Sequence, residues 1–277
     1  MDVLRIAAFS DGESGGNPAG VVIADTMPAD DDMRRTAATV GFSETAFAAP
    51  LGQGWRVRYF SPESEVPFCG HATIALGAAL ALRHGNGTFD LTLNQADISV
   101  EGRRNGDLIE AALQSPRTRS APAPSSLLSA ALDLFGYRAD DLDPALSPAR
   151  IHGGVDHLLL ALKTRADLAA MNYDLDRGRK LMNREGLTTI LLAWAESPQR
   201  FHTRNPFAGG GVYEDPATGA ATAALAGYLR DIDWRHGGGI DVVQGEDMGM
   251  RSRLRAEIPD ERGSSIRVSG TARLMAP

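Results

Sequence analysis

Cysteine is almost absent from this sequence, because Cys69 is the only one among 277 residues. A single cysteine excludes an internal disulfide bond and any zinc site built on several cysteines. Sparse cysteine usage of this kind is typical of a reducing compartment, so we expect a cytoplasmic protein.

Long runs of one kind of residue are also missing. The arginines are scattered and the formal net charge is -7, so we expect no nucleic-acid partner. The longest apolar run, residues 72–82, is too short to span a membrane, and residues 1–5 lack the apolar core of a signal peptide. We therefore expect a globular protein without membrane association, large enough for one big domain or two ordinary ones.

The signature motifs of several enzyme classes are absent. Gly12, Gly15 and Gly16 do not have the spacing of a dinucleotide fingerprint. The sequence has no phosphate loop, no histidine pair at helical spacing for a metal, and no nucleophile elbow. The expected strands and helices do not alternate as in a parallel Rossmann sheet. We therefore expect a site that needs no metal and no cofactor.

What the sequence does contain is an unusual stretch at residues 60–85. A turn with a thiol, an imidazole and two carboxylates leads into a helix that has no polar face between Ile74 and Leu82. A helix that is apolar on all sides must be buried. Its first turn offers unpaired N–H groups, which can hold a substrate carboxylate beside Cys69 and His71. The alternative is an ordinary buried helix with a capping turn.

The second half of the chain repeats this plan. Another small and apolar helix is expected at residues 220–229, and corresponding helix and strand starts in the two halves lie 144 or 145 residues apart. We predict an α+β protein with two pseudo-symmetric halves, residues 1–118 and 119–277, each a barrel-like, mostly antiparallel sheet around its central apolar helix. The last strands are expected to return to the first half. Residues 114–126 have the composition of a linker.

The remaining expected elements are short. Two further helices are expected at residues 29–40 and 174–185, each followed by a glycine that ends it. Strands are expected at residues 3–9, 21–24, 44–49, 55–61, 88–93, 98–101 and 108–113 in the first half, and at residues 157–162, 188–196, 200–204, 240–244, 254–258, 266–268 and 273–275 in the second.

The two apolar helices suggest where the site lies. If an approximate two-fold axis relates the halves, the N-termini of these helices meet at a cleft, which suits an anionic substrate. Glu44 and Asp215 add carboxylates there. Carboxylates together with an imidazole suit proton transfer at carbon, in which a base removes a proton and an acid returns it elsewhere.

Each of these residues also has a plain structural alternative. Asp215 precedes a proline, as a helix N-cap often does. His71 can be a satisfied buried histidine and Cys69 a small buried hydrophobe, while Glu44 can be an exposed carboxylate at a strand end. Their convergence on one predicted cleft favours the functional interpretation.

These residues lie in motifs that resemble the PhzF-like phenazine-biosynthesis isomerase family. The resemblance extends from one end of the chain to the other. The motifs are GNPAGVV at 16–22, SETAF at 43–47, RYFSPESEVPFCGHAT at 58–73, HTRNPFA at 202–208, EDPATGAA at 214–221 and QGEDMGM at 244–250.

The resemblance implies a diaminopimelate epimerase-like fold and a cofactor-free isomerase. The glutamate of the SET motif, here Glu44, is implied to shuttle the proton, with His71 and Asp215 as catalytic partners. The family resemblance and the edge strands of half-barrels indicate a homodimer. The residues implied to frame the substrate are Asn17, Gly70, Thr73, Thr218, Gly219 and Ala220.

One departure from the family concerns the substrate. Ala220 stands where the family motif has serine, so we expect a small carboxylate-bearing molecule without assigning the phenazine precursor itself. Two alternatives remain open. One is a racemase or epimerase that pairs Cys69 with Asp215, since a single cysteine excludes a two-thiol mechanism; the other is a catalytically silent small-molecule-binding relative.

Overall fold

The chain folds into two compact units in the computed structural model, which describes residues 1–106 and 108–276. Unit 1 comprises Met1–Gln114 together with the C-terminal segment from Val268, and unit 2 comprises Ser115–Arg267. Each unit combines a sheet with helices, so the predicted α+β class is confirmed.

The strands of unit 1 form a continuous hydrogen-bonded circuit. Neighbours follow the order β1, β2, β3, β4, β6, β7, β8, and β17 pairs with both β8 and β1. The pairs β2–β3 and β4–β6 are parallel. The strands are β1 (Leu4–Ser10), β2 (Asn17–Ile23), β3 (Thr45–Leu51), β4 (Gly54–Phe60), β5 (Glu65–Val66), β6 (Gly87–Thr92), β7 (Asp97–Asn105), β8 (Leu108–Gln114) and β17 (Arg267–Leu274).

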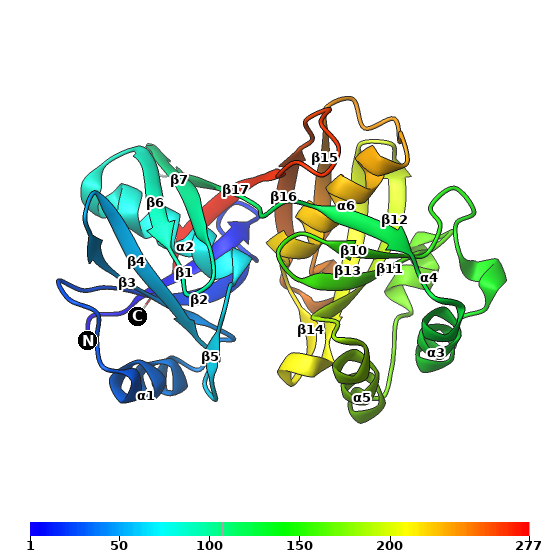
Figure 1. Ribbon diagram of the computed structural model, residues 1–277, viewed down its shortest axis with the longest axis horizontal. Helices are drawn as coiled ribbons and strands as arrows, with labels where there is room; N and C mark the ends of the chain where they lie inside the picture. The colour runs from blue at the N-terminus through cyan, green and yellow to red at the C-terminus, as the bar shows by residue number, and fades with distance from the viewer. Residues whose placement is uncertain (107, 277) are drawn as a thin grey trace. The chain divides into compact units, whose positions relative to one another are not determined.

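Helix α2 (Gly70–His84) is the core of unit 1, and Figure 1 shows it among these strands. Its residues 70–81 are all buried, as expected for a helix without a polar face. Small residues allow this burial: a Cβ atom on Gly102 of β7 would lie 2.2 Å from the carbonyl oxygen of Gly77. Helix α1 (Asp30–Val40) packs outside the strands through Met33 and Ala37.

Unit 2 repeats the order of strand directions found in unit 1. Neighbours follow the order β9, β10, β11, β12, β13, β15, β16, with β11–β12 and β13–β15 parallel and the other pairs antiparallel. The strands are β9 (Arg119–Pro122), β10 (Ala149–His152), β11 (Asp156–Ala161), β12 (Thr189–Ser197), β13 (Arg200–Phe207), β14 (Val212–Asp215), β15 (Gly239–Gln244) and β16 (Ser252–Glu257).

Helix α6 (Gly219–Asp231) takes the place in unit 2 that α2 takes in unit 1. Its residues 219–230 are buried, and a Cβ atom on Gly153 would lie 2.7 Å from the carbonyl oxygen of Ala220. A second apolar core joins the strands to three outer helices and includes the fully buried Leu158, Met182 and Ile190. These helices are α3 (Ser125–Phe135), α4 (Arg165–Ala169) and α5 (Leu175–Glu185), and three single 3₁₀ turns lie at Ala139–Asp141, Ala208–Gly210 and Glu246–Met248.

The structure corrects two of the expected elements. Residues 114–126 are not a plain linker, because they contain β9 and the start of α3. Their proline and serine content suggested a linker, but β9 gains its hydrogen bonds from β10, which lies far along the chain. The expected strands at 266–268 and 273–275 are one strand, β17.

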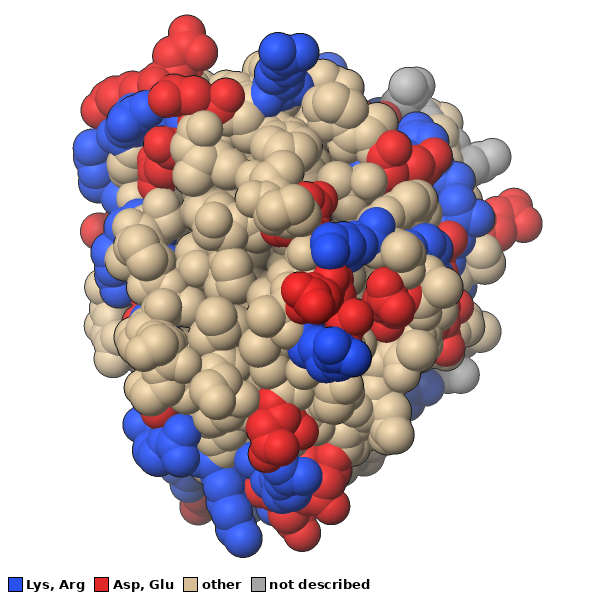
Figure 2. Space-filling view, turned by 90° about the vertical axis from the view of Figure 1, so that its right-hand side faces the viewer, with Lys and Arg blue, Asp and Glu red and all other residues tan. Residues whose placement is uncertain are grey.

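Charges of both signs lie side by side on the surface. Figure 2 shows one face on which lysine or arginine and acidic side chains surround a broad uncharged area. Exposed ion pairs include Arg177 with Asp133 at 2.7 Å and Arg262 with Asp233 at 2.9 Å. Among residues 1–106 and 108–276, no helix has both the length and the apolar character needed to cross a membrane.

Candidate active site

Three predicted site residues come together at the start of α2 in unit 1. Cys69 is the N-cap of the helix and His71 is its second residue. Glu44 follows Gly41, which ends α1 in a left-handed conformation, and directly precedes β3. The three residues are only 5–8% exposed. The alternative of an exposed Glu44 is therefore wrong.

The imidazole of His71 lies between the thiol and the carboxylate. Its Nδ1 atom is 3.3 Å from Sγ of Cys69, and its Nε2 atom is 3.4 Å from a carboxylate oxygen of Glu44. The hydroxyl oxygen of Ser43 lies 3.3 Å from the same Nε2 atom. A neutral imidazole has one N–H donor and one acceptor nitrogen, so a proton on Nε2 is donated to an oxygen acceptor while Nδ1 can accept from the thiol.

Thr73 and Tyr59 stabilise the first turn of α2 through hydrogen bonds of their hydroxyl groups. The Thr73 hydroxyl donates to the carbonyl oxygen of Cys69 at 2.7 Å, so it accepts from the Tyr59 hydroxyl, also at 2.7 Å. Complete burial raises the pKa of Tyr59 well above its ordinary value, so the phenol stays a hydrogen-bond donor. Thr73 therefore uses its hydroxyl to position Cys69.

The first turn of α2 has the polarity that favours an anion. Within the described residues the Cys69 side chain makes no capping hydrogen bond to these groups. An α-helix leaves its first N–H groups without intrahelical partners, and its dipole makes this end positive. Gly70, predicted to frame the substrate, is the first residue of this turn.

Asn17 also belongs to unit 1, where it is the first residue of β2 and is 1% exposed. The preceding Gly16 has φ of +84°, and a Cβ atom there would lie 2.8 Å from the carbonyl oxygen of Ala8. Glycine is required at this turn, because a side chain would displace β2 and Asn17 with it.

The other predicted residues form a second group, at the start of α6 in unit 2. Asp215 ends β14, Thr218 is the helix N-cap, and Gly219 and Ala220 are its first residues. The Thr218 hydroxyl donates to the Asp215 carboxylate at 2.5 Å. Asp215 is therefore not the N-cap that the sequence suggested as an alternative; it binds the N-cap side chain instead.

Gln244 at the end of β15 organises this second group. Its amide nitrogen donates to the carbonyl oxygen of Asp215 at 2.6 Å and to the Thr218 hydroxyl at 3.0 Å. Its amide oxygen accepts from the Thr218 N–H at 3.1 Å. Gln244 thus binds both the N–H and the hydroxyl of the N-cap residue Thr218, and it also binds the carbonyl oxygen of Asp215 in the preceding turn.

Sequence reasoning missed Ser43, Tyr59 and Gln244 as site residues. All three lie inside motifs that carry the family resemblance, so the signal was present, but their roles depend on partners far along the chain. It also missed the buried ion pair between Arg204 and Glu214, whose side chains are linked at 2.5 Å and 3.0 Å.

The unit 1 cluster has the donor types of a zinc site. One ligand atom from each of Glu44, Cys69 and His71 can be chosen so that all lie within 4.8 Å of one another. The thiol lies 3.3 Å from Nδ1 and 3.9 Å from Nε2, and the carboxylate lies 3.4 Å from Nε2. Contacts of this length fit a hydrogen-bonded relay for proton transfer, and the same three donors could also hold an ion at Nε2.

Comparison with known proteins identifies relatives over nearly the whole chain. A family model described as phenazine biosynthesis-like protein matches residues 6–276. A trans-2,3-dihydro-3-hydroxyanthranilate isomerase of Pseudomonas aeruginosa is 31% identical over 280 residues, which cover 98% of this chain and 96% of the relative.

Solved structures share the fold. A PhzF family protein of Bacillus anthracis has a TM-score of 0.85 at 22% identity and covers 100% of this chain and 98% of its own. A hydroxyproline epimerase of Agrobacterium vitis has a TM-score of 0.64 at 9% identity, covering 99% of this chain and 89% of its own. The chain therefore belongs to the PhzC/PhzF family of phenazine biosynthesis-like proteins and is an isomerase.

Proposed function

We propose that this isomerase moves a proton between two atoms of a small carboxylate-bearing metabolite, with Glu44 as the general acid and base. The observation that carries the proposal is the buried contact between Glu44 and His71, with 3.4 Å between the carboxylate oxygen and Nε2. A general base must be held within reach of the proton it takes, and burial excludes water that would compete for it.

The proposed step needs no redox partner. The Glu44 carboxylate takes a proton from a carbon atom next to an unsaturated bond of the substrate, and the electron pair of the broken C–H bond shifts along that system. The resulting carboxylic acid returns the proton to the atom at the far end. His71 positions the carboxylate throughout the cycle through the Nε2 contact.

The N-terminus of α2 is the proposed site for the substrate carboxylate. Its first N–H groups and the positive end of its dipole favour an anion, and they are adjacent to Cys69 and His71. In this proposal Gly70 admits the ligand because it has no side chain, and Asn17 contributes a polar group from β2.

Asp215 and Thr218 are proposed as further polar groups in the same reaction. The Thr218 hydroxyl donates to the Asp215 carboxylate, and Gln244 donates to that hydroxyl and to the Asp215 carbonyl oxygen, which supports a catalytic role beyond helix capping. A double-mutant cycle tests this proposal, because Glu44→Gln and Asp215→Asn should be non-additive if both groups act on one transition state.

The substrate class follows from the relatives and from one substitution. The Pseudomonas aeruginosa relative is named for a cyclic hydroxy-amino carboxylate, which supports a small carboxylate as the substrate here. Ala220 supplies no hydroxyl at the start of α6, so the proposed substrate lacks the group that the family serine would bind. We also propose a cytoplasmic homodimer, which light scattering at micromolar concentration can test.

A second candidate function rests on the thiol. Sγ of Cys69 lies 3.3 Å from Nδ1 of His71 at a helix N-terminus, where the imidazole can exchange a proton with the thiol. An epimerase would use Cys69 on one face of a stereocentre and Asp215 on the other. A silent binding protein is the third candidate, and it predicts ligand-induced thermal stabilisation without any exchange of substrate protons.

The decisive experiment is a screen of small carboxylic acids in heavy water, followed by mass spectrometry. The isomerase proposal predicts deuterium uptake into at least one compound with the wild-type protein. Glu44→Gln keeps the shape of the side chain and removes its titrating group, so uptake should fall at least about a hundredfold. Unchanged uptake in Glu44→Gln would exclude Glu44 as the general base.

A further inference from the structure

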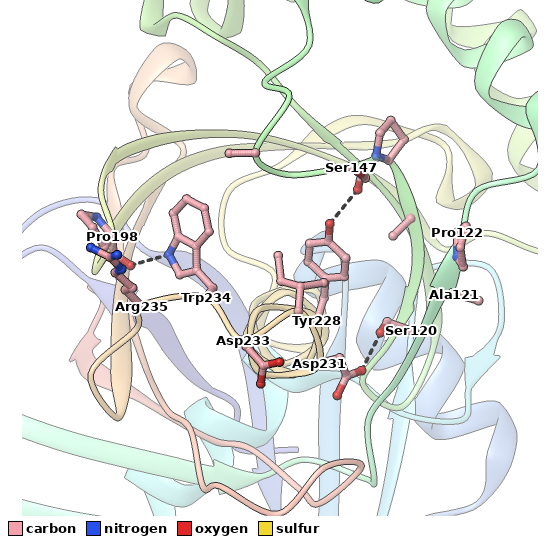
Figure 3. Close-up of a pocket in the computed structure, with 14 residues that line it drawn as sticks. Ser120, Ala121, Pro122, Ser147, Pro198, Tyr228, Asp231, Asp233, Trp234 and Arg235 are labelled. Atoms are coloured by element: carbon pink, nitrogen blue, oxygen red, sulfur yellow. Dashed lines mark hydrogen bonds between the residues drawn. The ribbon is translucent and has the colours of Figure 1, made fainter.

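A cavity of about 590 Å³ lies in unit 2 at the C-terminal end of α6. The proposed catalytic groups Asp215 and Thr218 lie at the opposite end of this 13-residue helix, about 20 Å away along its axis, and do not line the cavity. The volume is in the range of small-molecule sites. Figure 3 shows that its walls come from β9, the end of α6 and the loop that follows, with Ser147 and Pro198 on neighbouring turns.

The walls of the cavity are mainly flat and apolar. The rings of Tyr228 and Trp234 project from the end of α6 and the loop after it, and Pro122 and Pro198 add rigid surface. Trp234 is partly exposed, and Ile232 beside it is 39% exposed. Aromatic and proline surfaces of this kind bind a flat apolar body at little entropic cost.

The hydrogen-bond donors that line the inner cavity are already used. The Tyr228 hydroxyl donates to the carbonyl oxygen of Ser147 at 2.8 Å, and the Trp234 indole N–H donates to the carbonyl oxygen of Pro198 at 2.9 Å. The Ser120 hydroxyl donates to the Asp231 carboxylate at 2.5 Å. A ligand that brings only acceptors therefore finds no donor among these three side chains.

The Asp231 carboxylate keeps capacity for a ligand. A carboxylate offers about four acceptor positions, and the Ser120 hydroxyl takes one of them. The guanidinium of Arg230 is 3.8 Å away at its Nε atom and donates its other hydrogen bonds to Thr118 and Ser264. Asp231 is the last residue of α6, so the negative end of the helix dipole adds to its charge.

Two further charged residues, Asp233 and Arg235, line the cavity and have opposite signs, so Asp231 still favours a cationic ligand. Asp233 is exposed and pairs with Arg262, and Arg235 is an exposed lining residue of the cavity. We infer that the cavity is a second ligand site, which binds a small aromatic or alkyl amine with its cation on Asp231 and its apolar body between Tyr228 and Trp234. Nothing in this inference depends on the proposed isomerase mechanism.

The test uses two probes of similar size and opposite charge, 2-phenylethylamine and 3-phenylpropionate. Binding to the 277-residue chain is followed by tryptophan fluorescence. The signal of Trp234 is the part of the change that the wild-type protein shows and the Trp234→Phe variant does not. We expect saturable binding of the amine below about 10 mM, an affinity typical of a ligand with so few atoms. The carboxylate should give no saturable change in the Trp234 signal.

Matched charge variants locate the cation. Asp231→Asn keeps an acceptor for Ser120 and should weaken amine binding about tenfold or more, because a charge-assisted hydrogen bond is lost. Asp133→Asn removes an equally negative but exposed residue of the same unit that lies outside the cavity, and should leave binding unchanged.

Three binding results would each overturn the inference, and a dimer at this cavity would be a fourth. They are an absence of saturable amine binding, equal binding of both probes, and unchanged affinity in Asp231→Asn. A dimer would assign the cavity to a second copy of this chain instead, if the Ile232→Asp substitution dissociates it and 2-phenylethylamine does not affect its formation.

Discussion

His71 Nε2 and a carboxylate oxygen of Glu44 lie 3.4 Å apart, and both side chains are buried. If the imidazole positions the carboxylate, His71→Gln should lower turnover by about tenfold or more, but less than Glu44→Gln does. The same variant should also alter the pH profile of turnover, which a purely structural role would leave unchanged. Deuterium uptake by the accepted carboxylic acid measures both effects.

Ser43→Ala is the control for the contact with His71. The Ser43 hydroxyl faces the same Nε2 atom at 3.3 Å, and its removal keeps both the acid and the imidazole. We expect less than about a threefold change in rate, since the Glu44 carboxylate and the Cys69 thiol also contact that nitrogen. A greater loss in His71→Gln than in Glu44→Gln would assign the proton transfer to the imidazole.

Cys69→Ala separates the isomerase from an epimerase mechanism. We predict little change in stability and less than about a tenfold loss of rate, because in our proposal the thiol packs beside His71 and does not transfer the proton. Parallel measurements on Cys69→Ala and Glu44→Gln with the same substrate decide the matter. Loss of activity in the cysteine variant with full activity in Glu44→Gln would establish the thiol mechanism.

The close approach of α2 and β7 predicts a large stability effect at Gly102. A Cβ atom there would lie 2.2 Å from the carbonyl oxygen of Gly77, which cannot move without shifting the buried helix. Gly102→Ala should therefore lower the free energy of unfolding by about 3 kcal/mol, as overpacking against backbone does. Urea denaturation followed by circular dichroism measures the difference.

Gly87→Ala is the matched control for that substitution. Gly87 is the direct cross-strand partner of Gly102 and is exposed, and a Cβ atom there would lie no closer than 3.8 Å to its nearest neighbour, the Phe89 ring. We expect a change within about 0.5 kcal/mol. Equal destabilisation by both substitutions would mean that general strand propensity, and not the contact with α2, explains the effect.

His157 makes the stability of unit 2 dependent on pH. Complete burial lowers the pKa of His157 to about 3, and its Nδ1–H donates to the Thr189 hydroxyl at 2.8 Å, because that hydroxyl in turn donates to Asn205. In the unfolded chain the His157 imidazole binds a proton near pH 6.5, whereas in the folded chain it stays neutral down to about pH 3. The contribution of His157 to the free energy of unfolding is therefore fully present above pH 6.5 and is lost as the pH decreases toward 3.

Between pH 6.5 and pH 3, His157 alone should change the free energy of unfolding by up to about 1.4 kcal/mol per pH unit. Urea midpoints between pH 7 and pH 4 measure it, and His157→Gln should reduce the slope. His84→Gln, which removes an exposed histidine of unit 1, should not. NMR signals of the His157 ring that titrate near pH 6 in the folded protein would contradict the prediction.

The sequence by itself determined the elements that depend on local pattern. Helices α2 and α6 were predicted because long stretches of alanine, glycine and leucine have no polar face, and such helices must be buried. Gly41 and Gly186 correctly marked the ends of α1 and α5, because both adopt the left-handed conformation that glycine favours. The repeated spacing likewise predicted one plan of strands in both halves of the chain.

Only the tertiary structure decided which side chains meet. Ser43 and His71 are 28 positions apart, and Gln244 reaches Thr218 across 26 positions, so no local pattern predicts either pair. Residues 119–122 form a strand because β10 supplies their hydrogen bonds, against their linker-like composition. Asp215 resembled an N-cap in sequence, but its carboxylate accepts from the Thr218 hydroxyl and its carbonyl oxygen accepts from Gln244. Satisfying buried polar groups depends on partners that folding brings from elsewhere in the chain.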